Sequence, residues 1–127
     1  MNTNIFKTLF AGVVMSLAAL ASAHHSNTPF DMSRRLEATG VVTKANFKNP
    51  HSLLTLDLVE GGQGIVTFEG HSLATLRHYG LKPSMVKEGQ TVTISYAPRI
   101  DGDPGGIFLI ITVESGETLD FSNFGYK

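Results

Sequence analysis

The strongest constraint on the fold is the alternation of apolar and polar residues in short segments separated by Gly, Pro and Asn. Segment 51–59 is the clearest case, because Leu54, Leu56 and Leu58 share one face and polar residues share the other. A period of two is typical of a strand that buries one face in a protein core. Four further segments are rich in β-branched and aromatic residues, so we expect strands at 36–47, 64–69, 91–96 and 107–113.

Two departures from this pattern refine the predicted fold. Residues 72–79 change to a spacing near 3.6, with Ser72 as a cap and Gly80 as a stop, which predicts a short helix. In the first strand the apolar face changes parity near Lys44, which predicts a β-bulge that bends the strand. Three strands, a helix and two strands is the order of the OB-fold. We therefore predict an all-β fold with one short helix, a five-stranded OB-fold-like barrel, with a small open β-sandwich as the alternative.

The loop Glu60–Gln63 sets the register of the second and third strands. If Val59 lies opposite Gly64, Ser52 faces His71, whereas a shift of one residue would pair His51 with His71. The predicted core consists of the inward-facing apolar residues Val42, Leu54, Leu56, Leu58, Val66, Phe68, Leu76, Val92, Ile94 and Tyr96.

The first residues are typical of a secretory signal peptide. The apolar segment Leu9–Leu20 follows the single positive charge of Lys7 and precedes the small residues Ala21 and Ala23. It is shorter than the about 20 residues of a membrane-spanning helix. We expect cleavage between Ala23 and His24, a periplasmic or secreted location, and no membrane span in the mature protein.

The remaining chain is expected to form one domain with extensions at both ends. Phe30 is expected to pin an extended arm on the barrel. The tail carries Phe121, Phe124 and Tyr126, which could contact a partner or, more simply, close an open end of the barrel. The expected organisation is a signal peptide at 1–23, an arm at 24–35, an OB-like β domain at 36–120 and a tail at 121–127.

Composition argues against several classes of function. The 127-residue chain has 10 Lys and Arg against 11 Asp and Glu, whereas binding to nucleic acid needs a basic surface. It has no cysteine, hence no disulfide and no thiolate site. No nucleophile-elbow, zinc-protease or phosphate-loop motif is present. These observations favour a protein that is not an enzyme and does not bind nucleic acid.

The histidines carry the most specific chemistry. Cleavage after Ala23 would leave His24 as the first residue, so that its α-amine and imidazole could chelate Cu(II) together with the imidazole of His25. His51 and His71 lie at the same end of the predicted hairpin and are the candidate third ligands. Glu69 is the candidate residue that orients a ligand ring by accepting its hydrogen. Alternatively, His51 only holds the Asn-Pro turn and His71 only begins the helix.

Several segments together resemble a family of small secreted bacterial proteins classed as a domain of unknown function. The most specific are the mature start A-H-H-S and the motif N-P-H. The resemblance implies a periplasmic or secreted β-rich domain, without an established activity. This chain departs from the family in lacking tryptophan, with Phe47 where a Trp is usual, and in having Gly70-His71-Ser72 after the glutamate. The matching segments are Ala23–Ser26, Phe30–Asp31, Gly40–Val42, Asn49–His51, Glu69, residues 89–94, Asp101–Gly102 and Gly105–Gly106.

Two functions are therefore expected. One is a secreted or periplasmic, non-enzymatic copper-binding protein that uses the N-terminal histidine pair. The other is a periplasmic accessory or binding module that contacts a protein or a small molecule through the barrel face and needs no metal. Only the first requires tight, pH-dependent copper binding that is lost when the terminal amine is blocked.

Overall fold

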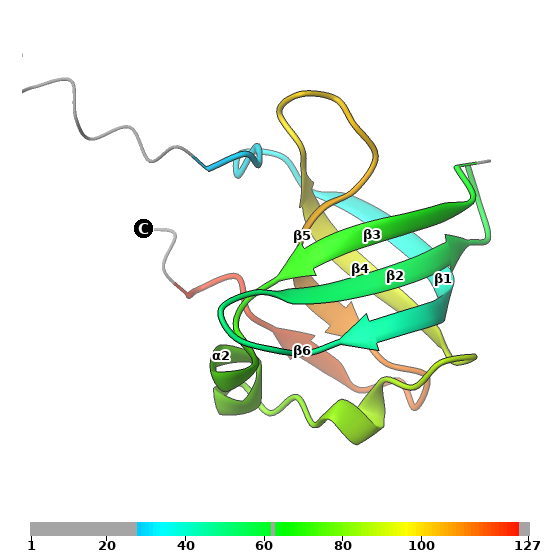
Figure 1. Ribbon diagram of the computed structural model, residues 1–127, viewed down its shortest axis with the longest axis vertical. Helices are drawn as coiled ribbons and strands as arrows, with labels where there is room; N and C mark the ends of the chain where they lie inside the picture. Colours follow the sequence, from blue (N-terminus) through cyan, green and yellow to red (C-terminus); the bar gives the residue numbers. More distant parts are fainter. Residues whose placement is uncertain (1–27, 62, 125–127) are drawn as a thin grey trace, which may run out of the picture.

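Five strands close into a barrel in the computed structural model, which describes residues 28–61 and 63–124. The β1–β2, β2–β3, β1–β4 and β4–β5 pairs are antiparallel, and a parallel pairing of β3 with β5 at Glu69 and Ile107 closes the barrel. This topology confirms the predicted OB-fold-like barrel and excludes the open sandwich. The strands are β1 (Leu36–Asn46), β2 (Ser52–Leu58), β3 (Ile65–Gly70), β4 (Thr91–Pro98) and β5 (Gly106–Thr112), as Figure 1 shows.

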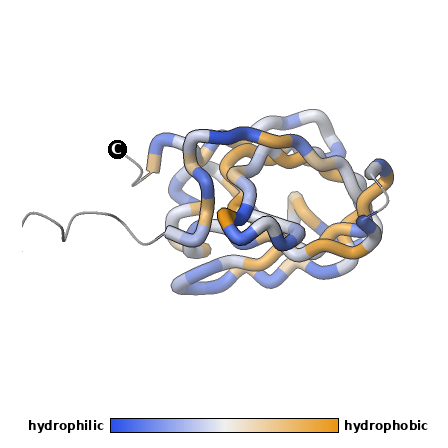
Figure 2. The backbone as a smooth tube through the Cα atoms, turned by 90° about the horizontal axis from the view of Figure 1, so that it is seen from above, coloured by the Kyte–Doolittle hydropathy of each residue, from blue (hydrophilic) through white to orange (hydrophobic). Residues whose placement is uncertain are grey.

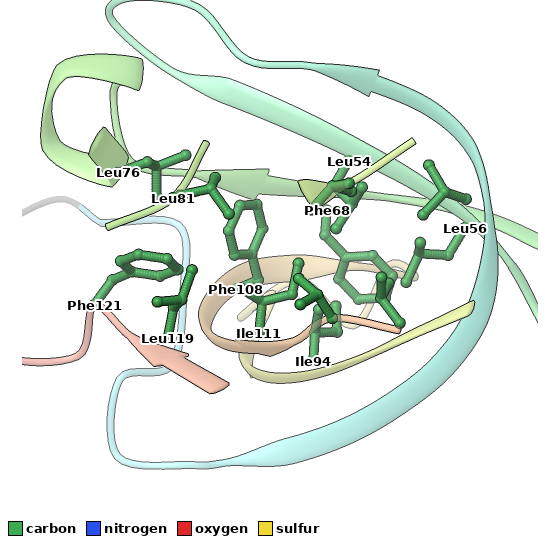
Figure 3. Close-up of a cluster of buried hydrophobic side chains, with 14 of the residues drawn as sticks. Leu54, Leu56, Phe68, Leu76, Leu81, Ile94, Phe108, Ile111, Leu119 and Phe121 are labelled. Atoms are coloured by element: carbon green, nitrogen blue, oxygen red, sulfur yellow. The ribbon is translucent and has the colours of Figure 1, made fainter. Parts of the chain in front are cut away.

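The helix α2 (Leu73–His78) lies between β3 and β4, as predicted. The Oγ atom of Ser72 accepts a hydrogen bond from the Thr75 N–H at 3.1 Å, which confirms the predicted cap. Leu76 of α2 is fully buried at one end of the core cluster, near Leu81 and Phe121 (Figure 3). A short 3₁₀-helix, η1 (Pro83–Met85), follows α2. No helix among the described residues is long and apolar enough to cross a membrane.

Irregularities in two strands decide which side chains face the core. The β1–β2 register shifts between Val42 and Lys44, which confirms the predicted bulge in β1. A second shift in the β4–β5 pairing leaves Leu109 as the extra residue of β5. As a result Phe108 and Ile111 both join the main core, whereas Leu109 faces the other way.

The predicted register of the β2–β3 hairpin was wrong by one residue. Asp57 pairs with Ile65, and the N–H of Leu58 donates to the carbonyl oxygen of Gly64 at 2.9 Å. Val59 leaves this ladder because its N–H donates to Thr39 of β1 at 3.1 Å. The loop is therefore one residue longer than predicted, and the alternative register, with His51 and His71 at the same hairpin end, holds.

The core fills the barrel and includes residues that follow β5, the last of the predicted strands. Of the predicted core residues, Leu58 and Tyr96 are only partly buried and pack against the cluster, and the others are buried. Figure 2 shows hydrophobic residues interleaved with hydrophilic ones along the barrel wall. The strand β6 (Thr118–Asp120) extends the sheet beside β5, and Phe121 after it is fully buried. Phe121 therefore packs over the end of the barrel, which agrees with the simpler of the two expectations for the tail.

The outer face of β5 is covered by the arm that precedes β1. Phe30 is 5% exposed and clusters with Ala97, Ile107 and Leu109. The backbone holds the arm there, because the N–H of Asp31 donates to the Pro98 carbonyl at 2.8 Å. Phe30 thus pins the arm, as expected, and β5 is apolar on both faces for this reason.

Candidate functional site

The loop between β1 and β2 is fixed to the start of α2. The carbonyl of Lys48 accepts from the Leu73 N–H at 3.0 Å, and Oδ1 of Asn49 accepts from the Ala74 N–H at 3.2 Å. Both acceptors satisfy N–H groups that the first turn of a helix leaves without an intrahelical partner. The Asn-Pro-His motif therefore acts as part of the cap of α2, with a cis bond between Asn49 and Pro50.

This loop places His51 beside Glu69 at the end of the β2–β3 hairpin. Nδ1 of His51 lies 3.0 Å from Oε1 of Glu69, and their side chains are 63% and 32% exposed. Glu69 sits in β3, and its backbone pairs with Leu53 of β2 and with Ile107 of β5. The imidazole is therefore held by a carboxylate from the strand where the barrel closes, and most of the ring remains open to solvent.

His71 occupies the same hairpin end but is buried. Its side chain is 7% exposed, and its ring meets that of Phe124 edge to face, with the centroids 5.4 Å apart. Burial lowers the pKa of His71, a hydrogen bond to the backbone of Phe121 acts in the opposite direction, and the nearby charge of His51 lowers it further. The structure thus brings His51, Glu69 and His71 together, while the predicted site residues His24 and His25 lie outside the described residues.

A hollow of about 330 Å³ opens next to Glu69. Its wall includes Phe30 from the arm and Leu53 from β2, and Arg99 from the loop after β4. Arg99 is braced within that loop, because its Nε donates to Oδ1 of Asp101 at 3.0 Å. Hydrogen bonding from Arg99 lowers the pKa of Asp101.

Sequence reasoning missed this juxtaposition of the arm, β3 and the loop after β4. The three segments are far apart in the chain and meet only when β3 pairs with β5. A partial signal existed in the two-residue spacing of Arg99 and Asp101, which allows a local ion pair, but nothing local indicated that Arg99 would face Glu69.

Across residues 28–61 and 63–124, no group of three or more His, Asp or Glu side chains could hold a metal ion. His51, Glu69 and His71 therefore do not form a complete metal site by themselves. A metal bound at this hairpin end would need further ligands.

Comparisons with known proteins describe the chain at the level of its family. A family model described as "Family of unknown function (DUF6152)" matches residues 12–108. None of the curated proteins compared with the chain matches it. The chain is similar to one in a crystal structure of TiaS in complex with a tRNA and ATP, with a TM-score of 0.47 and 14% identity, over 66% of this chain and 19% of that chain. This chain therefore spans about a fifth of that protein.

Proposed function

The chain belongs to a family of unknown function (DUF6152), and from that premise we propose that it is a secreted or periplasmic, non-enzymatic copper-binding protein. The proposed site joins the mature N-terminal residues His24 and His25 to His51. The observation that carries the proposal is the 3.0 Å contact between His51 Nδ1 and Glu69 Oε1.

A carboxylate at one ring nitrogen prepares histidine for metal binding at the other. When Nδ1 of His51 donates to Glu69, Nε2 carries the lone pair. Metal-binding histidines commonly have such a carboxylate partner, which fixes the ring and raises its basicity. His51 is 63% exposed, so an ion can reach it. His71 is the alternative third ligand, and its burial makes His51 the better choice.

The position of the arm supports contact between His51 and the N-terminal histidines. Phe30 and Glu69 line the same hollow, and Phe30 is pinned by burial. His25 precedes Phe30 by five residues, which an extended chain spans in at most about 18 Å. A tether this short gives a high effective concentration of the histidine pair near His51.

The terminal chelate determines which metal is preferred. An α-amine and imidazoles form a nitrogen-rich site, and nitrogen sites favour copper over the other divalent first-row metals. We expect tighter binding of Cu(II) than of Zn(II). Because amines and imidazoles ordinarily titrate near pH ~8 and ~6.5 and bind metal deprotonated, affinity should fall steeply below about pH 6.

The test is calorimetric titration of Cu(II) into processed protein that begins at His24. The same protein with its α-amine blocked by acetylation should bind Cu(II) more weakly, since the terminal chelate then lacks the amine nitrogen as a ligand. His51→Ala should also weaken binding, and Glu69→Gln should do so by about tenfold, as loss of a ligand's orienting partner does.

The matched control is His78→Ala, which removes an exposed imidazole from α2 and should leave copper affinity unchanged. If the protein with the blocked amine binds copper as tightly as the native start, the terminal chelate is not the site. If His51→Ala and His78→Ala behave alike, His51 is not a ligand.

A further inference from the structure

Positive charge is concentrated at one end of the barrel. Segments 43–50 and 71–90 contain five Lys and Arg and one Glu, a net charge of +4 with histidines neutral. The rest of the described chain contains three Arg and ten Asp and Glu, a net charge of −7. The nearly balanced composition therefore conceals a strong separation of charge. The cations of the two segments, here called the basic end, are Lys44, Lys48, Arg77, Lys82 and Lys87.

Hydrogen bonds hold the two segments against each other. The carbonyl of Lys48 accepts from the Leu73 N–H at 3.0 Å, which fixes the β1–β2 loop to the first residue of α2. The turn that carries Lys87 is joined to β1, because the carbonyl of Val42 accepts from the Gly89 N–H at 2.8 Å. Figure 1 shows α2 and the chain that follows it along one end of the barrel. The cations of the basic end thus belong to one surface.

The cations of the basic end are available to a partner. All five residues are exposed, and none of them forms an ion pair within 4.0 Å with another described residue. Carboxylates border the side of Lys87, since Glu88 follows it and Glu114 accepts from the Thr91 N–H at 3.3 Å.

The positive field is therefore strongest around α2. Arg77 lies in the last turn of this helix, which is about 9 Å long. Lys48 is tied to its first residue, and Lys82 follows Leu81, whose N–H donates to the carbonyl of Leu76 at 2.9 Å. These three cations surround the helix without a carboxylate in either segment on this side.

The shape of this charge distribution favours a flat anionic partner. A planar surface can contact the basic end while the acidic remainder of the protein faces away from it, whereas a flexible polyanion would meet both. Half-buried Leu73 and Tyr79 and exposed Pro83 lie among the cations, and aromatic and apolar side chains mixed with Lys and Arg suit the headgroup region of a bilayer. We propose that the basic end docks the protein on a bilayer that contains anionic phospholipids.

The test is sedimentation of the protein with vesicles made of equal parts phosphatidylglycerol and phosphatidylcholine. The protein begins at His24, so that the apolar segment 9–20 cannot insert, and EDTA removes copper. Binding should be saturable in lipid, absent with vesicles of phosphatidylcholine alone, and largely lost between 50 and 300 mM NaCl because salt screens the attraction. Equal binding to both kinds of vesicle, or no binding to either, overturns the proposal.

Variants locate the contact. Arg77→Gln should weaken binding about fivefold, as expected for one cation near an anionic bilayer, and Lys48→Gln with Lys82→Gln added should abolish it. The matched control Arg34→Gln removes an exposed guanidinium outside the basic end and should change nothing. An equal loss in Arg34→Gln would contradict the location. Displacement of the protein from the vesicles by a single-stranded DNA 20-mer at equal concentration of phosphate would identify nucleic acid as the better partner and would also overturn the proposal.

Discussion

Gly106 occupies a place where two strands approach too closely for any side chain. A Cβ atom there would lie 2.1 Å from the carbonyl oxygen of Ala97 and 2.8 Å from Cδ2 of Tyr96. The first of these atoms is backbone of β4, which cannot move without disturbing the β4–β5 ladder. The glycine is therefore required for β5 to begin beside β4.

We predict that Gly106→Ala lowers the free energy of unfolding by about 3 kcal/mol, the upper end of overpacking costs. The comparison variant is Gly102→Ala, where a Cβ would meet nothing within 4 Å and only the positive φ of 82° opposes it. That variant should cost about 1–2 kcal/mol. Urea unfolding of both measures the difference, and equal losses would contradict the close approach.

The buried imidazole of His71 predicts how stability depends on pH. Burial lowers the pKa of His71 in the folded protein, so the unfolded chain binds the proton more readily. The free energy of unfolding should therefore be constant above about pH 6.5, the ordinary pKa of histidine in an unfolded chain. It should fall as the pH drops below about 6.5 and level off once the pH is below the lowered pKa of His71 in the folded protein. Urea titrations from pH 7.5 to 4.5 in EDTA measure this slope.

His71→Gln should reduce that slope whatever it does to stability at pH 7.5. His78→Gln, which replaces an exposed imidazole, should leave the slope as in the native protein. An unchanged slope in His71→Gln would show that another group causes the acid sensitivity.

Among the elements, α2 depends on groups from outside its own sequence. Backbone N–H groups of its first turn donate hydrogen bonds to the side chains of Ser72 and of Asn49, which lies in the β1–β2 loop. Ser72→Ala should lower the unfolding free energy by about 1 kcal/mol, and Asn49→Ala by a similar amount, because each removes an acceptor from a helix N-terminus. Ser84→Ala, at an exposed serine of η1, is the matched control. Thermal unfolding in which the control loses as much as Ser72→Ala would show that the cap contributes nothing.

The strands and the helix could be predicted where residues close together in the chain determine them. The change of parity near Lys44 identified the β1 bulge, and Ser72 and Gly80 bounded the helix. The β2–β3 register was not predictable, because the extra loop residue results from a hydrogen bond between Val59 and Thr39 of another strand. The three residues of β6 are too few to show a period.

At the scale of the whole molecule, the sequence did not predict that the arm, β3 and the loop after β4 meet. The pairing of Glu69 with Ile107 that closes the barrel joins residues far apart in the chain. His51, Glu69 and His71 could be assigned to one hairpin end from the chain alone. The hollow that Phe30 and Glu69 share could not be predicted, because it depends on how the arm packs on the closed barrel.

This arrangement predicts that Phe30 affects copper affinity without binding copper. Phe30→Ala removes the buried side chain that holds the arm together with the backbone hydrogen bonds of Pro29 and Asp31. Release of the arm as far as the start of β1 would lengthen the tether of His25 from five residues to eleven. Effective concentration falls roughly as the −3/2 power of tether length, so binding to the joint site should weaken by about threefold. Ile100→Ala, at a side chain 67% exposed, is the control in calorimetric titration. Equal affinities of the two variants would contradict the role of the arm.

Whether the N-terminal histidines and His51 share one copper ion can be read directly from paramagnetic broadening. Substoichiometric Cu(II) is added to ¹⁵N-labelled protein that begins at His24, and the amide signals that disappear first are recorded. We predict simultaneous loss of signals before Phe30, at His51 and Ser52, and at Glu69 and Gly70. Broadening confined to the first residues of the arm, with the end of the β2–β3 hairpin unchanged, would contradict the joint site.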